Sequence, residues 1–219
     1  MNAAAAAAPP LYAEFAVQSN FSFLRGASQA EELMVTARRL GLAAIGLADC
    51  NTVAGTVRAW KMADEAGLAY HPGCRLVFSD GTPDILAYPR DRQGWAHLCR
   101  MLTEANQAGE KGRPDLVRDM FMRWGGNLSL AVLPAFEANA STELALLREL
   151  ERAFGTAVRL AVAPLLSGDD RFRLEQAAAM AAAAGVRLMA VNDVLYHDPG
   201  RRTLQDVVTS TRDAVSVAA

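Results

Sequence analysis

The chain has little of the chemistry on which metalloenzymes and secreted proteins rely. Its 219 residues include three histidines and three cysteines, which are Cys50, Cys74 and Cys99. The cysteines are widely spaced and form no CxxC pair, so neither a disulfide framework nor a structural zinc site is predicted, and a reducing, cytoplasmic setting is expected. The formal net charge of −2 lacks the basic excess typical of a free-standing duplex-DNA binder.

Long apolar runs are also missing. The alanine-rich segment AAAMAAAAG is too short to span a bilayer and is flanked by charges, so no membrane association is expected. The opening MNAAAAAAPP has neither the basic region nor the apolar core of a signal peptide, and residues 1–10 are therefore predicted to be a disordered Ala/Pro leader. Residues 11–219 show no linker, and the 52% hydrophobic content can form a sizeable core, which predicts a single domain.

From Leu11 onward, short apolar runs alternate with helical patterns, an order typical of strands joined by crossover helices. Ser28 and Glu31 fit a capping box that opens a helix, and Pro114 is placed to start a later one. About seven strands, each followed by a helix or a helical turn, predict an α/β fold, namely a closed or nearly closed (βα) barrel. An open doubly wound sheet is the alternative. The expected strands cover 11–18, 42–49, 71–78, 84–89, 127–134, 157–164 and 186–193.

In a βα barrel, functional residues lie at the C-terminal ends of the strands. Asp49 and Asp193 follow two of the predicted strands, where a carboxylate could bind a cation or a proton, or simply cap the next helix. A metallohydrolase generally needs three or more ligands for each ion, usually including histidine. His71 begins a strand and would lie at the opposite end of the barrel, His97 is within a helix, and only His197 is near the expected site.

The segment VQSNFSFLRGAS, residues 17–28, follows the first strand, where a catalytic loop would lie. It contains no histidine, acid or cysteine. Cys50, which follows Asp49, has no histidine or basic neighbour in the sequence, so a buried, inert thiol is the favoured interpretation. The residues alone therefore place polar groups at strand ends without defining a catalytic site.

Several segments resemble, in order and spacing, the PHP (polymerase and histidinol phosphatase) domain at the N-terminus of C-family bacterial DNA polymerases. The likeness is strongest to the error-prone, ImuC-like branch of the DnaE-type polymerases, and it covers essentially Leu11 to the end. The matching segments are SNFSFLRGAS, LGLAAIGLADCNTVAGTVRAW, DILAYPRDRQGWAHLCRMLT, EKG and VNDVLYHDPGRRTLQDVV. The resemblance implies a distorted seven-stranded (βα) barrel of the PHP type. In active members, His, Asp, Glu and sometimes Cys side chains at the strand ends hold metal ions for phosphoester hydrolysis.

Several positions that carry metal ligands in that family hold other side chains here. The opening HxH of the family falls on Ala16 and Gln18, and its Asp-His pair after the second strand becomes Asp49-Cys50. The final Asp-x-His keeps its aspartate, Asp193, and has leucine in place of its histidine. The resemblance therefore implies a chain that has lost the imidazole ligands of the family and has no catalytic or metal-binding residues.

Charge is reversed at two further positions. The family's glutamate after the third strand becomes Arg75 and its loop acid becomes Arg25, while its histidine at the start of the fourth strand becomes Asp84. Fixed guanidinium charges would repel divalent cations and could pair with Asp49, Asp84 or Asp193, or gather with Arg90 around an anion. The degenerate cleft is predicted to comprise Gln18, Asn20, Arg25, Asp49, Cys50, Arg75, Asp84, Asn192 and Asp193.

The resemblance implies the N-terminal PHP domain of an error-prone DNA polymerase active in translesion synthesis and the DNA-damage response. The domain would support the polymerase structurally or by interaction, with no hydrolase activity of its own. Its expected partners are the palm and thumb, DNA through the parent protein, and other mutagenesis proteins or the sliding clamp. No cofactor is expected here; Mg²⁺ would serve the palm carboxylates, which this chain lacks. The alternative is an active PHP-type phosphoesterase with a reduced ligand set of Asp49, Cys50, Asp193 and His197.

Overall fold

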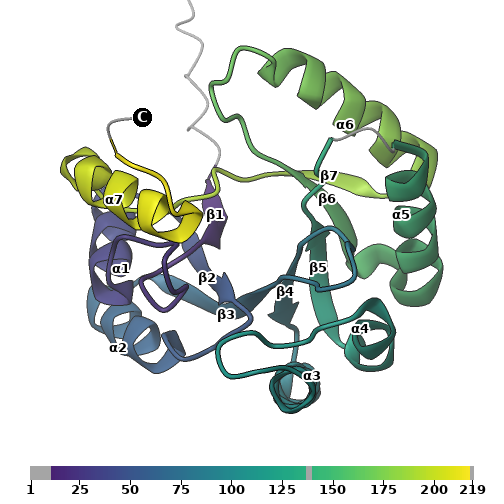
Figure 1. Ribbon diagram of the computed structural model, residues 1–219, viewed down its shortest axis with the longest axis horizontal. Helices are drawn as coiled ribbons and strands as arrows, with labels where there is room; N and C mark the ends of the chain where they lie inside the picture. Colours follow the sequence, from purple (N-terminus) through teal and green to yellow (C-terminus); the bar gives the residue numbers. More distant parts are fainter. Residues whose placement is uncertain (1–10, 137–139, 218–219) are drawn as a thin grey trace, which may run out of the picture.

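The computed structural model describes residues 11–136 and 140–217, so the leader predicted over residues 1–10 lies outside the described part. Within it, seven strands form one sheet in chain order, curled into a barrel with helices around its outside (Figure 1). The predicted α/β barrel is therefore confirmed. The strands are β1 (Ala13–Val17), β2 (Ala44–Cys50), β3 (Ala69–Leu76), β4 (Ile85–Pro89), β5 (Leu128–Val132), β6 (Val158–Val162) and β7 (Arg187–Ala190).

Helices α1 to α6 pack their apolar sides on the outside of the sheet, and α7 does not. The largest core cluster lies between β3 to β6 and the helices outside them, and it includes Leu76, Phe121 and Leu147. No described helix is long and apolar enough to cross a membrane. The helices are α1 (Ala30–Arg39), α2 (Thr56–Ala66), α3 (Arg92–Ala108), α4 (Arg118–Trp124), α5 (Ala140–Phe154), α6 (Asp170–Ala184) and α7 (Arg202–Asp213), with two short 3-10 turns, Gly155–Ala157 and Pro199–Arg201.

One strand, β4, runs in the opposite direction to the others. It pairs antiparallel with both β3 and β5, whereas the remaining neighbours pair in parallel. Residues 77–84 join β3 to β4 without a helix, so the expectation of a helix after every strand is wrong here. A parallel crossover needs about a dozen residues or more, which this connection does not provide. As a result, Asp84 lies at the same rim as Arg75, and Tyr88 lies toward the other end of the barrel.

The barrel is closed by the segment that follows β7. The backbone N–H of Gln18 donates to the Val194 carbonyl (2.9 Å), and the N–H of Val194 donates to the Ala16 carbonyl (2.7 Å). Small side chains fill the interior around the buried ring of Tyr88. This seam joins β1 to the segment after β7, so the sheet is a nearly closed barrel and not the open, doubly wound alternative.

Two helix starts differ from the sequence prediction. The carboxylate of Glu32 accepts a hydrogen bond from the Gln29 N–H (2.9 Å), so the first turn of α1 is capped one residue later than Ser28 and Glu31 suggested. Helix α4 begins at Arg118 and not at Pro114, because the N–H of Asp115 donates to the Ala105 carbonyl (2.9 Å) and ties this segment to the end of α3.

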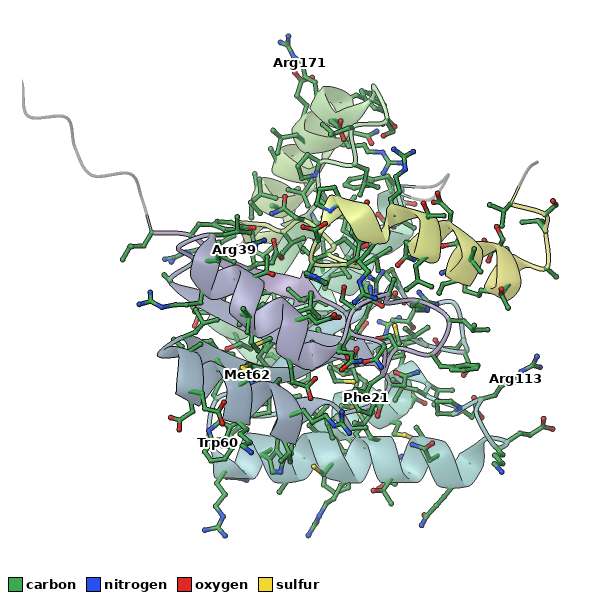
Figure 2. All side chains as sticks on the ribbon, turned by 90° about the vertical axis from the view of Figure 1, so that its left-hand side faces the viewer. Phe21, Arg39, Trp60, Met62, Arg113 and Arg171 are labelled. Carbon is green, nitrogen blue, oxygen red and sulfur yellow. The ribbon has the colours of Figure 1, made fainter. Side chains whose placement is uncertain are left out.

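Helix α7 is attached differently from the other helices. Its start lies beside α1, where Arg201 pairs with Glu32, and Nε2 of Gln205 donates to the Arg25 carbonyl in the loop after β1 (Figures 1 and 2). Gln205 is its only buried residue. Helix α7 therefore does not cover the outer face of β7, where Leu188 is 38% exposed.

Candidate functional site

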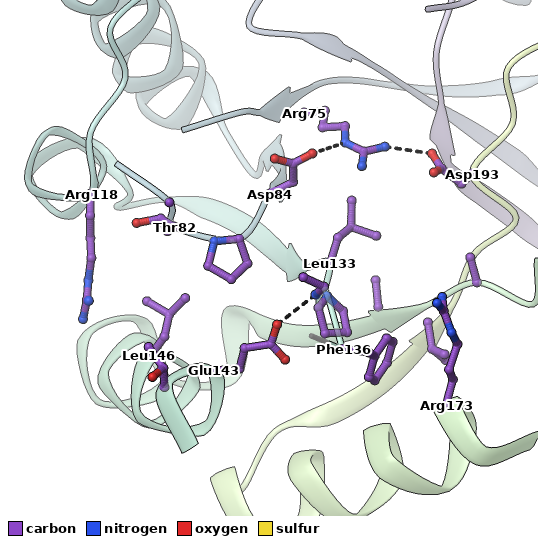
Figure 3. A pocket seen from close by; sticks show the side chains of 18 of the residues that line it. Arg75, Thr82, Asp84, Arg118, Leu133, Phe136, Glu143, Leu146, Arg173 and Asp193 are labelled. Carbon is purple, nitrogen blue, oxygen red and sulfur yellow. Dashed lines mark hydrogen bonds and ion pairs between the residues drawn. The ribbon is translucent and has the colours of Figure 1, made fainter. Parts of the chain in front are cut away.

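A cleft of about 790 Å³ lies at the rim where β3 ends and β4 begins. This rim is the end at which a βα barrel carries its functional groups. Figure 3 shows polar side chains from several elements around this space. The connections after β3, β5, β6 and β7 supply its walls, which include Arg75, Asp84, Leu133, Phe136 and Asp193.

Arg75 lies between two carboxylates in this cleft. Its Nε donates to Oδ2 of Asp84 (2.7 Å) and its Nη1 donates to Oδ1 of Asp193 (2.9 Å), as the dashed lines in Figure 3 mark. We call Asp84, Arg75 and Asp193 the Arg75 clasp. Burial lowers the pKa of Arg75, but the nearby charges of Asp193 and Asp84 raise it by a larger amount. The net pKa therefore lies above its ordinary value. The guanidinium therefore stays charged and ties β3 to the start of β4 and to the segment after β7.

The clasp continues through an amide to a thiol. Nε2 of Gln18 donates to Oδ1 of Asp193 (3.2 Å), and Sγ of Cys50 donates to Oε1 of Gln18 (3.1 Å). Burial raises the pKa of the Cys50 thiol, and the opposing influence of Arg25 and Arg75 does not cancel this. The thiol is therefore protonated at neutral pH, in agreement with its role as a donor.

Asp49 is buried next to the cleft and anchors the loop after β1. Its carboxylate accepts three hydrogen bonds, from the N–H of Ser19 (2.7 Å), the hydroxyl of Ser22 (2.7 Å) and the hydroxyl of Ser19 (2.8 Å). Burial raises the pKa of Asp49, while the bonds from Ser22 and Ser19 act in the opposite direction. Sequence reasoning missed Ser22, although a serine in a short loop after a strand is the kind of donor a buried carboxylate needs.

Three of the predicted residues lie apart from the clasp. Asn20 is exposed, and its backbone N–H donates to the Ser28 carbonyl (2.8 Å). Arg25 is partly buried, its carbonyl accepts from Nε2 of Gln205 (2.7 Å), and it forms no ion pair within the described ranges. The expected pairing with cleft aspartates is therefore made by Arg75 and not by Arg25. Arg90 follows β4 at the opposite end of the barrel, so the three arginines do not gather around one anion.

Asn192 faces the barrel seam and not the cleft. Its N–H and Nδ2 both donate to Oε2 of Glu14 (3.0 and 2.8 Å). The other carboxylate oxygen of Glu14 accepts from the N–H groups of Phe15 (2.9 Å) and Ala16 (2.8 Å). Sequence reasoning missed Glu14, for which the signal was an acid inside an otherwise apolar strand. Its carboxylate satisfies backbone donors where β1 meets the segment after β7.

The histidines do not join the cleft aspartates. Nδ1 of His197 is 2.7 Å from the Ser28 hydroxyl and 3.7 Å from the Glu32 carboxylate. His97 contacts the Gly126 carbonyl (2.9 Å), and His71 packs against Phe15. Across residues 11–136 and 140–217, no group of three or more His, Cys, Asp or Glu side chains could hold a metal ion. The donors in the cleft are thus engaged with a guanidinium and with hydroxyls.

These features define a class, an α/β barrel of seven strands with one reversed strand and a polar cleft at one rim. The model of the PHP domain matches residues 14–175, and the chain belongs to that family. An amidohydrolase of Chromobacterium violaceum has a similar fold, with a TM-score of 0.59 at 16% identity over 88% of this chain and 89% of its own.

Curated relatives carry polymerase names. The chain is 62% identical over 209 residues to an error-prone DNA polymerase of Mesorhizobium japonicum, and 45% identical over 212 residues to error-prone DNA polymerase 1 of Rhizobium meliloti. These matches cover 94% and 96% of this chain. In both cases the chain spans 19% of the relative's length. It is therefore similar to about a fifth of each of these polymerases.

Proposed function

We propose that this chain is the PHP domain of an error-prone DNA polymerase, that its metal site is degenerate, and that it has no hydrolase activity of its own. The observation that carries this proposal is the Arg75 clasp. A guanidinium that is charged at any physiological pH occupies the space between two carboxylates of the cleft, Asp84 and Asp193. A divalent cation there would have to displace it and would meet a fixed positive charge.

The remaining groups support the same conclusion. Asp49 already accepts three hydrogen bonds from Ser19 and Ser22, so recruiting it as a ligand would leave buried donors unsatisfied. The Cys50 thiol donates a hydrogen bond to Gln18, and it keeps its proton because burial raises its pKa. The donor set therefore does not suit the metal cluster expected of active family members.

In this proposal the domain acts within a longer polymerase. The curated relatives are about five times as long as this chain. Their length supports the proposal that the main partner is the remainder of the polymerase, including its palm and thumb. DNA contact, translesion synthesis and the DNA-damage response belong to the parent enzyme, and Mg²⁺ would serve its palm carboxylates. Contacts with the sliding clamp or with other mutagenesis proteins, and a cytoplasmic location, are part of the same proposal. A domain without hydrolase activity suits an enzyme that must leave nucleotides in place opposite damage.

The alternative, a phosphoesterase with a reduced ligand set, needs Asp49, Cys50, Asp193 and His197 to share an ion. The ring of His197 instead contacts Ser28 and Glu32, in the hollow between α1 and the segment after β7. Asp193 is held by Arg75 and Gln18. The geometry therefore supports a phosphoesterase less well than it supports a domain without hydrolase activity.

The decisive experiment measures metal content and turnover on one sample. The 219-residue chain is dialysed against trace zinc and manganese, analysed by plasma mass spectrometry, and assayed with a p-nitrophenyl phosphate ester. We expect substoichiometric metal and no turnover. Stoichiometric metal with turnover would overturn the proposal and favour the phosphoesterase.

Two substitutions at Arg75 separate the effect of its charge from the effect of a new ligand. Arg75→Glu adds a third carboxylate beside Asp84 and Asp193, whereas Arg75→Gln removes the positive charge without adding one. If both variants keep the fold by circular dichroism, metal uptake should rise for Arg75→Glu and less for Arg75→Gln. Equal, negligible uptake by both folded variants would show that Arg75 is not what keeps metal out.

A further inference from the structure

A second hollow, of about 570 Å³, lies at the opposite end of the barrel from the clasp. Phe15, His71, Tyr88, Arg90 and Arg159 are among its lining residues. In the ladder between β2 and β3, His71 pairs with Gly46 and Arg75 pairs with Cys50. The two sites are thus four residues apart along β3, which is about 13 Å of extended chain. None of these lining residues belongs to the Arg75 clasp that carries the function proposed above.

The hollow gathers positive charge. Arg90 and Arg159 line it, and none of its described lining residues is an aspartate or glutamate. Arg187 on β7 pairs in register with Arg159 on β6, so both side chains leave the same face of the sheet. Within the described ranges, none of these three arginines forms an ion pair, and Nη1 of Arg159 donates to the carbonyls of Thr156 and Val158. Like charges side by side on a sheet destabilise it unless an anion lies between them.

Aromatic rings also line the hollow and form what we call its aromatic wall. The rings of Phe15 and Tyr88 meet edge to face with centroids 5.2 Å apart, and the ring of His71 lies 5.5 Å from that of Phe15. Tyr88 is held in place because its hydroxyl donates to the carbonyls of Phe15 and Gly46. The wall is therefore a fixed apolar surface against which a planar ring can pack.

We propose that this hollow binds a small molecule that combines phosphate groups with a planar ring, of the nucleoside diphosphate class. Two phosphoryl groups carry enough negative charge to balance Arg90 and Arg159, which line the hollow, together with part of the charge of the neighbouring Arg187, whereas a single carboxylate does not. Guanidinium groups also bind phosphate oxygens in a bidentate geometry. The volume falls within the range usual for small-molecule sites, and it is far too small for duplex DNA.

The test is calorimetric titration of ADP, inorganic phosphate and adenosine into the 219-residue chain at low ionic strength. ADP should bind more tightly than either of its parts, and added salt should weaken the binding. Arg159→Gln and Arg90→Gln should each weaken ADP binding at least about tenfold, the loss expected for one charge-assisted hydrogen bond. Because Arg90 is exposed, its variant keeps the test valid even if Arg159→Gln fails to fold.

The matched control is Arg171→Gln, which removes the same charge from the exposed end of α6, where Arg171 protrudes in Figure 2. It should bind ADP like the unmodified chain. Equal affinities for the Arg90, Arg159 and Arg171 variants, or no ADP binding at millimolar concentration, would overturn the assignment. Inorganic phosphate binding as tightly as ADP would overturn the role given to the aromatic wall. Preference for a single-stranded oligonucleotide over ADP would overturn the small-molecule class.

Discussion

Asp49 ends β2 with its carboxylate already bonded to Ser19 and Ser22, so its role is to hold the loop over residues 19–22 in place. Asp49→Asn replaces one carboxylate oxygen, which accepts hydrogen bonds, with an NH₂ group, which can only donate them. We expect a loss of about 2–4 kcal/mol in the free energy of unfolding, because buried donors lose a charged acceptor. Urea denaturation measures this loss. Asp64→Asn, on the exposed side of α2, should change stability little.

The same carboxylate predicts a pH dependence. Burial raises the pKa of Asp49 above its usual 3.8, so the native state binds this proton more tightly than the unfolded chain. The contribution of Asp49 to stability therefore falls as the pH rises from 3.8 through the raised pKa, and grows on acidification through that interval. Since asparagine does not titrate, the stability of the wild type relative to Asp49→Asn should increase as the pH is lowered. A difference that stays constant with pH would contradict the raised pKa.

Individual contacts of the site were only partly accessible from the sequence. Arg75 among cleft aspartates could be anticipated from charge, because opposite charges at neighbouring strand ends attract. Which arginine pairs, and which polar residue turns away, depends on backbone direction at each strand end. Asn192 and Asp193 are adjacent in the chain, yet one bonds to Glu14 at the seam and the other to Arg75 in the cleft. Composition carries no information on that choice.

At the scale of elements, the reversal of β4 places Tyr88 inside the barrel against two glycines. A Cβ atom on Gly73 would lie 2.3 Å from the Tyr88 ring, and one on Gly46 would lie 2.7 Å from it. Because Tyr88 is buried and hydrogen-bonded, it cannot move aside cheaply. Gly73→Ala should therefore lower stability by about 1–3 kcal/mol, as overpacked cores do, in thermal or urea denaturation.

Gly126→Ala is the matched control, since a Cβ there would make an ordinary 3.7 Å contact with His97. It should change stability by less than about 1 kcal/mol. A double-mutant cycle sharpens the prediction: in a Tyr88→Ala background, Gly73→Ala should lose most of its effect. An unchanged cost in that background would place the strain elsewhere in the β3–β4 pair.

The element order was predictable because apolar runs and helical patterns are local signals. The direction of β4 could not be predicted from its sequence, because side chains alternate in the same way in a strand that runs in either direction. The short connection over residues 77–84 was the available clue, since it leaves no room for a crossover helix. The helix starts were displaced for a tertiary reason: Ser28 contacts His197, and Asp115 is tied to Ala105.

The seam between β1 and the segment after β7 gives a further test at this scale. The carboxylate of Glu14 accepts from two backbone N–H groups of β1 and from the N–H and amide of Asn192. Glu14→Gln should cost about 2–3 kcal/mol and speed hydrogen exchange at Asn192 and Val194, because an amide cannot satisfy all these donors. Glu65→Gln, exposed on α2, serves as the control. Unaltered exchange at Val194 would show that the seam closes without this carboxylate.

In the whole molecule, the helices are held to the barrel with unequal strength. Helix α3 buries five residues against the sheet, whereas α7 buries only Gln205 and leaves Leu204 and Val207 more than 40% exposed. The closure of the barrel depends on the segment that precedes α7, through Val194 and Leu195, and not on α7 itself. The fold of the barrel and the attachment of its last helix are therefore separable properties.

Local stability should follow this division. Amides in α7 should exchange with solvent at rates close to those of a frayed helix, while those of α3 should exchange only through global unfolding, since few apolar contacts resist the opening of α7. Hydrogen exchange followed by mass spectrometry at several protein concentrations measures both helices in one sample. Protection of α7 equal to that of α3 and independent of concentration would contradict the weak attachment. Protection that grows with concentration would instead mean that a second copy of the chain covers Leu204 and Val207. In that case this surface would not be free to contact the remainder of a polymerase.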